Sequence, residues 1–169
     1  MDFNGLKEMG IQRLAFVGAR LVLAWTFLWA FFDKLLGLGH ETSTESAWIN
    51  GGSPTTGYLT YATTGPLSDF YQSLSGNSVA DAVFMGALLL LGVALLLGIG
   101  MKIAAYGGAL LMLTLWSSHL PPENNPLTDD HIVYALVLLG IAYAGAGDLL
   151  GLGKWWKGTA LVKRFPFLA

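Results

Sequence analysis

The stretch that decides the fold is AVFMGALLLLGVALLLGIGMKIAAYGGALLMLTLWSS, residues 82–118, in which almost every residue is apolar or small and Lys102 carries the only charge. At about 1.5 Å per residue it can cross a hydrocarbon core of about 30 Å nearly twice. The segment GIGMK (98–102) interrupts it with glycines and a lysine, which are typical of a helix end at a membrane surface. The pattern therefore predicts a transmembrane hairpin with helices over about 82–99 and 102–118.

The composition agrees with a membrane protein. Of 169 residues, 54% are hydrophobic, 12% are charged and 22 are glycine. The net charge of −2 gives no basic surface for nucleic acid, so that class of partner is excluded. The chain has no cysteine, which excludes disulfides, thiol chemistry, Cys-ligated zinc and iron–sulfur clusters within it.

Two further apolar runs predict a first helix over about 14–36 and a fourth over about 129–150, the latter capped by Thr128. We therefore expect an all-α fold, a four-helix transmembrane bundle forming one integral-membrane domain over 1–169. The long loop 37–81 contains breaks that predict short interfacial helices, and Asn77 or Ser78 with Asp81 resembles a capping box opening the second helix. Helix contacts are expected at small residues spaced four apart, namely Ala82 and Gly86, Ala104 and Gly108, and Gly147 and Gly151.

Charge asymmetry predicts the orientation. The loops 37–81 and 119–131 contain acidic residues but no lysine or arginine. Most of the nine basic residues flank the other side: Lys7, Arg13, Lys102, Lys154, Lys157, Lys163 and Arg164. By the positive-inside rule, we expect a multi-pass protein of the cell membrane with both termini cytoplasmic and both loops outside. All three histidines then lie on the outer side.

Charged and aromatic residues near the helix ends leave alternatives open. Arg20 lies deep in the first helix, where it either snorkels to the surface or forms an ion pair with Asp148. Asp33 and Lys34, near the opposite end, are either interface anchors or groups facing a cavity. An aromatic layer in the outer loop either anchors a lid or forms the wall of a site for a flat amphipathic ligand; its members are Trp48, Tyr58, Tyr61 and Tyr71.

The outer histidines are the most informative chemical feature. A quinone site needs hydrogen-bond donors to the carbonyls and a proton acceptor near water, and His119 or His131 beside Asp33 and Lys34 can supply both. The alternative is that these histidines are ordinary polar loop residues. The predicted catalytic residues are His119, His131, Asp33 and Lys34, and the predicted cofactor contacts are Trp29, Trp48 and Tyr58. No haem, iron–sulfur cluster or metal is expected, and without an inner histidine no two-haem relay across the membrane can be built.

Four segments carry a resemblance to a known family: WAFFDKLLGLG (29–39), AWINGGSPTTGYL (47–59), the hairpin, and DDHIVYALVLLGIAYAGAGDLLGLG (129–153). They resemble the DoxX/DoxD-like family, in particular its DoxD branch, the membrane subunit of thiosulfate:quinone oxidoreductase. The resemblance implies a four-helix membrane protein that, with a small partner subunit, oxidises thiosulfate to tetrathionate and passes electrons to a membrane quinone. A homo-oligomer or a larger membrane complex stays open.

The charges of the outer loops affect whether thiosulfate can bind there. Thiosulfate is a dianion, and the acidic outer loops lower its local concentration at neutral pH. An acidic exterior reverses this balance, and the candidate anion contacts are then Lys34, His40, His119 and His131. The alternative function is a non-catalytic scaffold or accessory subunit that binds a larger complex through its lid and basic tail. A transporter or channel is disfavoured because only Arg20 places a charge well inside a span.

Overall fold

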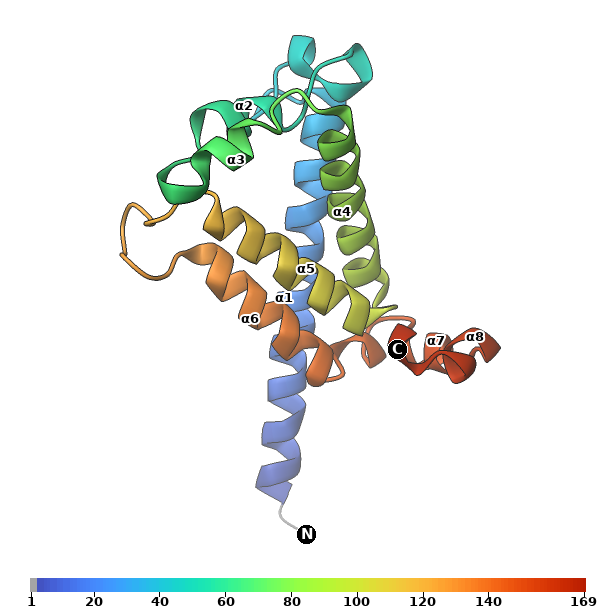
Figure 1. The fold of residues 1–169 in the computed structure, drawn as a ribbon. Coiled ribbons are helices and arrows are strands. Elements are labelled where there is room, and N and C mark those ends of the chain that lie inside the picture. Colours follow the sequence, from blue (N-terminus) through green and yellow to red (C-terminus); the bar gives the residue numbers. More distant parts are fainter. Residues whose placement is uncertain (1–2) are drawn as a thin grey trace.

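The structure is a computed structural model that describes residues 3–169, with side chains from residue 10 onward. Within that range it contains α-helices and short 3-10 turns and no strand, as expected for an all-α protein (Figure 1). The longest helices of this part are α1 (Phe3–Leu36), α4 (Ser78–Leu97), α5 (Met101–Ser117) and α6 (Asp130–Tyr143). The side chain of Lys7, on which the predicted orientation partly rests, lies outside the described residues.

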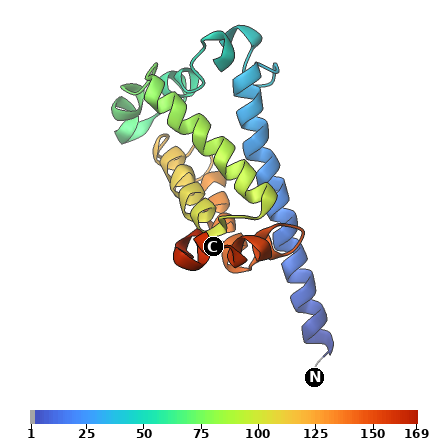
Figure 2. The same ribbon diagram turned by 90° about the vertical axis from the view of Figure 1, so that its right-hand side faces the viewer.

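The long helices pack as two pairs, α1 with α4 and α5 with α6 (Figure 1). The pairs meet at the turn Gly98–Gly100 and diverge toward the opposite end, where α2 (Thr56–Tyr61) and α3 (Ser68–Gln72) lie across the gap. We call the segment 53–74 the lid, the end that it covers the lid end, and the opposite end the hairpin end. At the hairpin end, α7 (Gly153–Gly158) and α8 (Ala160–Arg164) lie across the long helices (Figure 2).

Apolar residues fill the core and also cover its outer faces. Met85, Leu95, Leu138 and Ile141 are fully buried where the helices meet. On the outer faces, large apolar side chains are exposed, among them Val22, Leu90, Leu110 and Leu136. Gly10–Leu36 and Ser78–Leu97 are long and apolar enough to cross a membrane, whereas α5 and α6 are shorter apolar helices. These features are compatible with a membrane protein.

The predicted helix ends hold for the hairpin but not for the fourth helix. Asn77 caps α4 by accepting hydrogen bonds from the amides of Val79 and Ala80, and Gly98 ends α4 with a φ of 71°. The prediction for the fourth helix was wrong in its cap residue and in its C-terminal end. Asp129, not Thr128, is its N-cap, and the helix ends at Tyr143 rather than near residue 150. Gly145 has a φ of 65° and turns the chain into a 3-10 turn at Ala146–Asp148, after which Leu149 is extended.

Arg20 explains why the chain leaves the helix there. Its side chain is fully buried, and its guanidinium donates to the carbonyls of Leu95 (2.6 Å) and Leu96 (3.0 Å) in the last turn of α4. The same group donates to Leu149 (3.3 Å) and Leu150 (2.7 Å), carbonyls that a continuous helix would not turn toward it.

Both interpretations of Arg20, snorkelling and an ion pair with Asp148, were therefore wrong. Asp148 accepts instead from Lys157 at 2.8 Å. A cation at a helix C-terminus satisfies carbonyls that have no partner within the helix.

The predicted small-residue contacts are confirmed in part. A Cβ on Gly108 would lie 2.8 Å from the Leu138 side chain, and one on Gly147 would lie 2.5 Å from the Gly98 carbonyl oxygen. Gly86 faces open space, so its predicted contact was wrong. Sequence reasoning missed Gly92, where a Cβ would lie 2.6 Å from Leu28. The close backbone approach of Gly98 and Gly147 closes the hairpin end.

Candidate functional site

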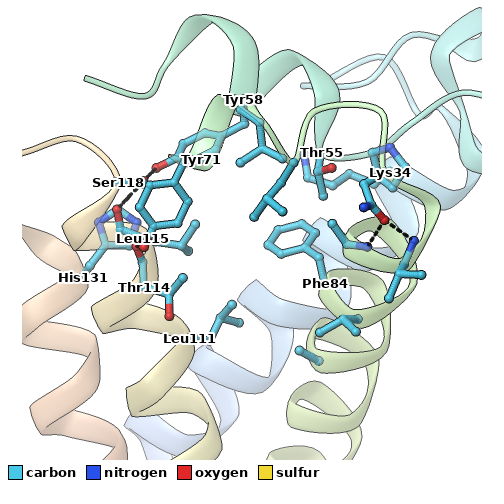
Figure 3. Close-up of a pocket in the computed structure, with 18 of the residues that line it drawn as sticks. Lys34, Thr55, Tyr58, Tyr71, Phe84, Leu111, Thr114, Leu115, Ser118 and His131 are labelled. Carbon is cyan, nitrogen blue, oxygen red and sulfur yellow. Dashed lines mark hydrogen bonds between the residues drawn. The ribbon is translucent and has the colours of Figure 1, made fainter. Parts of the chain in front are cut away.

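An apolar cavity of about 570 Å³ lies at the lid end, between α4 and α5 and beneath the lid (Figure 3). We call it the lid cavity. Most of its lining is carbon, contributed by Leu59, Leu74, Val83, Phe84, Ala87 and Leu111. It exists because α4 and α5 diverge from their turn and the lid bridges the gap. A space of this size and character is typical of a small-molecule site.

Polar groups lie at two opposite walls of the lid cavity (Figure 3). Tyr58, Ser118 and His131 lie on the α5 side, whereas Lys34 and Thr55 lie on the α4 side. The Lys34 ammonium is 3.9 Å from the Glu41 carboxylate, so a weakly held cation lies at the wall of the lid cavity. A ligand with polar atoms at both ends of a flat apolar body matches this arrangement.

Buried Asp81 fixes the lid to α4. One of its carboxylate oxygens accepts from the Ser53 hydroxyl (2.9 Å), the Thr55 amide (3.2 Å) and the Thr55 hydroxyl (2.6 Å). The predicted capping box with Ser78 was wrong, because the carboxylate reaches across to the lid instead of back along its own helix. The other edge of the lid is tied to α5, where the Tyr71 hydroxyl lies 2.7 Å from the Ser117 hydroxyl.

Tyr58 is the polar centre of the α5-side wall. Its hydroxyl lies 2.7 Å from the Ser118 hydroxyl and 3.3 Å from His119 Nδ1. Burial raises the pKa of Tyr58, and the hydrogen bond with Ser118 opposes this only in part. The phenol therefore keeps its proton at neutral pH and lies beside the His119 ring.

Behind Tyr58, His119 and His131 converge on Asp129. Asp129 Oδ2 lies 2.8 Å from His119 Nε2 and 2.8 Å from His131 Nδ1. Asp129 Oδ1 accepts from the His131 amide (3.1 Å) and the Ile132 amide (3.4 Å), so one oxygen caps α6 and the other faces the histidines. Burial alone would raise the pKa of Asp129, but the hydrogen bonds from His131 and His119 outweigh it and hold that pKa below its usual value. The carboxylate is thus ionised.

A second cavity of about 550 Å³, the loop cavity, lies on the other side of this cluster. Its lining includes Tyr58, Thr64, His119, Glu123 and His131. Tyr58 and His131 line both cavities and form the partition between them.

No protein-family model matches this chain, and the comparisons with curated proteins and with solved structures found no match. The candidate site therefore depends on its own geometry and chemistry.

The structure separates the predicted site residues into two groups. His119, His131, Lys34 and Tyr58 line the cavities at the lid end. Asp33 is buried, and its carboxylate accepts from the amides of three successive residues, His40 (3.3 Å), Glu41 (3.1 Å) and Thr42 (3.0 Å). This places Asp33 as the support of the turn that follows α1.

The two predicted tryptophan contacts lie elsewhere. Trp29 packs against His40, with ring centroids 4.9 Å apart, and half-buried Trp48 packs against the core. Neither lines the lid cavity or the loop cavity.

Sequence reasoning missed Asp129 as a site residue, because N-capping alone accounts for an aspartate at that position. The available signal was the spacing of His119, Asp129 and His131 around one proline-rich loop. It also missed Ser118, whose buried hydroxyl holds Tyr58.

Proposed function

We propose that this chain is the membrane subunit of a quinone-linked oxidoreductase and that the lid cavity binds the quinone ring. The observation that carries the proposal is the lid cavity itself, an apolar space with polar groups at two opposite walls. In this proposal α1, α4, α5 and α6 form a four-helix transmembrane bundle, with both termini in the cytoplasm and the lid outside.

The membrane placement is supported by helix length and surface chemistry. The 20 residues of α4 span about 30 Å, the thickness of a hydrocarbon core. The exposed faces of the long helices are apolar, and most of the described basic residues gather at the hairpin end, where Lys102, Lys154, Lys157 and Lys163 lie. Lys34 is the exception and lies at the lid end. The lid has no lysine or arginine. This asymmetry matches a cytoplasmic hairpin end.

The chemistry of a quinone fits the lid cavity. A benzoquinone ring is flat and apolar and has two carbonyl oxygens at opposite edges. Tyr58 and His131 can meet one oxygen while Lys34 meets the other (Figure 3). At the cavity edge Val79 and Val83 are largely exposed on α4, which leaves an apolar route between α4 and α5 for an isoprenoid tail.

The electron donor that we propose is thiosulfate, on the resemblance to the DoxX/DoxD-like family. Two thiosulfate ions each lose one electron and join through a new sulfur–sulfur bond, giving tetrathionate. The quinone takes up both electrons and two protons to become the quinol. Tyr58, hydrogen-bonded to His119 at 3.3 Å, is placed to deliver a proton from the side of the loop cavity. A small partner subunit supplies whatever this chain lacks for thiosulfate oxidation.

Mass spectrometry of the mildly solubilised complex tests the proposal. Co-purifying proteins and the organic extract are read together. The proposal predicts a stoichiometric small subunit and bound quinone, and such a complex should reduce a short-chain quinone with thiosulfate. A homo-oligomer without quinone, or a large unrelated assembly, would contradict the proposal and favour a non-catalytic membrane scaffold.

A further inference from the structure

We infer that His119, Asp129 and His131 form a binding site for one divalent transition-metal ion at the floor of the loop cavity. Two imidazoles and one carboxylate are the ligand set of many zinc and non-haem iron sites. One ligand atom from each of the three residues lies within 4.8 Å of the others. The inference does not depend on the lid cavity binding a quinone.

The distances between the ligand atoms are compatible with one shared metal ion. Asp129 Oδ2 is 2.8 Å from His119 Nε2 and 2.8 Å from His131 Nδ1. Ligand atoms bound to one metal at about 2.1 Å are separated by about 3 Å when their bonds are near right angles. A bound metal would replace the two protons that the imidazoles now share with the carboxylate. The two imidazole nitrogens lie within 4.8 Å of each other and come closer together when they share one ion, and the loop cavity beside them leaves room for the rings to turn.

The surrounding groups support metal ligation. His119 Nδ1, the nitrogen that faces away from the proposed metal, lies 3.3 Å from the Tyr58 hydroxyl, which fixes the ring as ligating histidines require. Asp129 Oδ1 caps α6, so the carboxylate is oriented by the helix and not by the metal. The Asp130 carboxylate lies 3.6 Å from His131 Nδ1 and adds a second negative charge beside the ion. Two carboxylates and two neutral imidazoles thus balance a divalent cation.

The remaining coordination positions face the loop cavity. His119 and His131 line this cavity together with Glu123, which is exposed. Three protein ligands with an open side are the arrangement of a reactive rather than a closed structural metal site. Water or a small anion can occupy the open side.

The experiment uses the full chain in nanodiscs, stripped with EDTA and titrated with zinc chloride by calorimetry and with cobalt chloride by visible absorption. We expect one ion per chain and cobalt d–d bands of a nitrogen- and oxygen-ligated ion. His119→Ala, His131→Ala and Asp129→Asn should each weaken zinc binding by more than about 100-fold, and Tyr58→Phe by about tenfold. His40→Ala is the matched control, because His40 packs on Trp29 away from this cluster and should leave binding unchanged.

A second measurement keeps the test decisive if a variant fails to fold. X-ray absorption of the zinc-loaded unchanged chain should show two imidazole ligands in the first shell. Fewer than two imidazoles, no saturable binding, or an equal loss in His40→Ala would overturn the inference and leave an adventitious ion only.

Discussion

The two ends of the molecule differ in how tightly they pack around their buried polar groups. At the hairpin end, Arg20 is enclosed by backbone carbonyls from α4 and from residues 149–150, and Gly98 and Gly147 approach closely, so the packing is tight. At the lid end, Asp81 and Tyr58 are held by side chains and a loop, and cavities stay open between them. Arg20, satisfied by backbone carbonyls, holds the fold together, whereas Tyr58, held by side chains beside a cavity, is placed to meet a ligand.

The largest expected effect is at Arg20. Arg20→Met removes the donors to the carbonyls of Leu95, Leu96, Leu149 and Leu150 and leaves these groups without partners. We expect the free energy of unfolding to fall by more than about 3 kcal/mol, read from denaturant unfolding in micelles by circular dichroism. Arg20→Lys should be intermediate, because an ammonium cannot reach both sets of carbonyls. An unchanged midpoint for Arg20→Met would show that this network does not hold the hairpin end.

The glycine contacts give a matched pair. Gly147→Ala places a Cβ 2.5 Å from the Gly98 carbonyl oxygen, and the backbone must shift. We expect a loss of about 1–3 kcal/mol in unfolding free energy. Gly86→Ala meets open space in the middle of α4 and should be neutral or stabilising by about 0.5–1 kcal/mol. Equal effects of the two substitutions would show that the close approach of Gly98 and Gly147 does not constrain the hairpin end.

The lid should open on its own when its anchor is removed. Asp81→Ala deletes the acceptor of the hydrogen bonds from Ser53 and Thr55, worth about 1–3 kcal/mol locally. We expect faster hydrogen exchange across the lid, with the amides of α5 and α6 unchanged. The control is Asp69→Asn, on the exposed side of the lid. If exchange rises equally in all helices, the lid is not a separate unit.

The smallest effect concerns pH. Because burial raises the pKa of Tyr58, the folded protein holds this proton after the unfolded chain begins to lose it near pH 10. The free energy of unfolding that this group contributes below that pH is therefore lost above it. Tyr58→Phe should make the decline less steep. Thermal midpoints of both proteins between neutral pH and about pH 11 measure the difference. Parallel curves would contradict a buried Tyr58 hydroxyl.

The sequence predicted the parts that depend on local pattern. The apolar run 82–118 with its glycine turn predicted the hairpin, and residue type narrowed the cap of α4 to Asn77 or Ser78, of which Asn77 is the cap. It could not predict the partners of Arg20, because carbonyls are present in every residue and give no signal at any one position. For the same reason the end of the fourth helix was misplaced.

The candidate site was predictable only in part. Histidines in a loop and a tyrosine in an aromatic layer identified His119, His131 and Tyr58, which do meet at the lid end. Asp33, Trp29 and Trp48 resembled site residues in the sequence but support the turn and the core. Asp129 resembled an ordinary acidic residue at the start of a helix, since its role in the site depends on a histidine ten residues away folding back onto it.

The most direct test of quinone binding places a larger side chain inside the lid cavity. Leu111 lines it, whereas its neighbour Leu110 is 66% exposed on the outer face of α5. Binding of decylubiquinone to the full chain in nanodiscs is measured for Leu111→Trp and Leu110→Trp. We predict that Leu111→Trp weakens binding by at least about tenfold because the indole occupies the cavity, and that Leu110→Trp binds as the unchanged chain does. Equal binding by both variants, or none by the unchanged chain, would contradict the lid cavity as a quinone site.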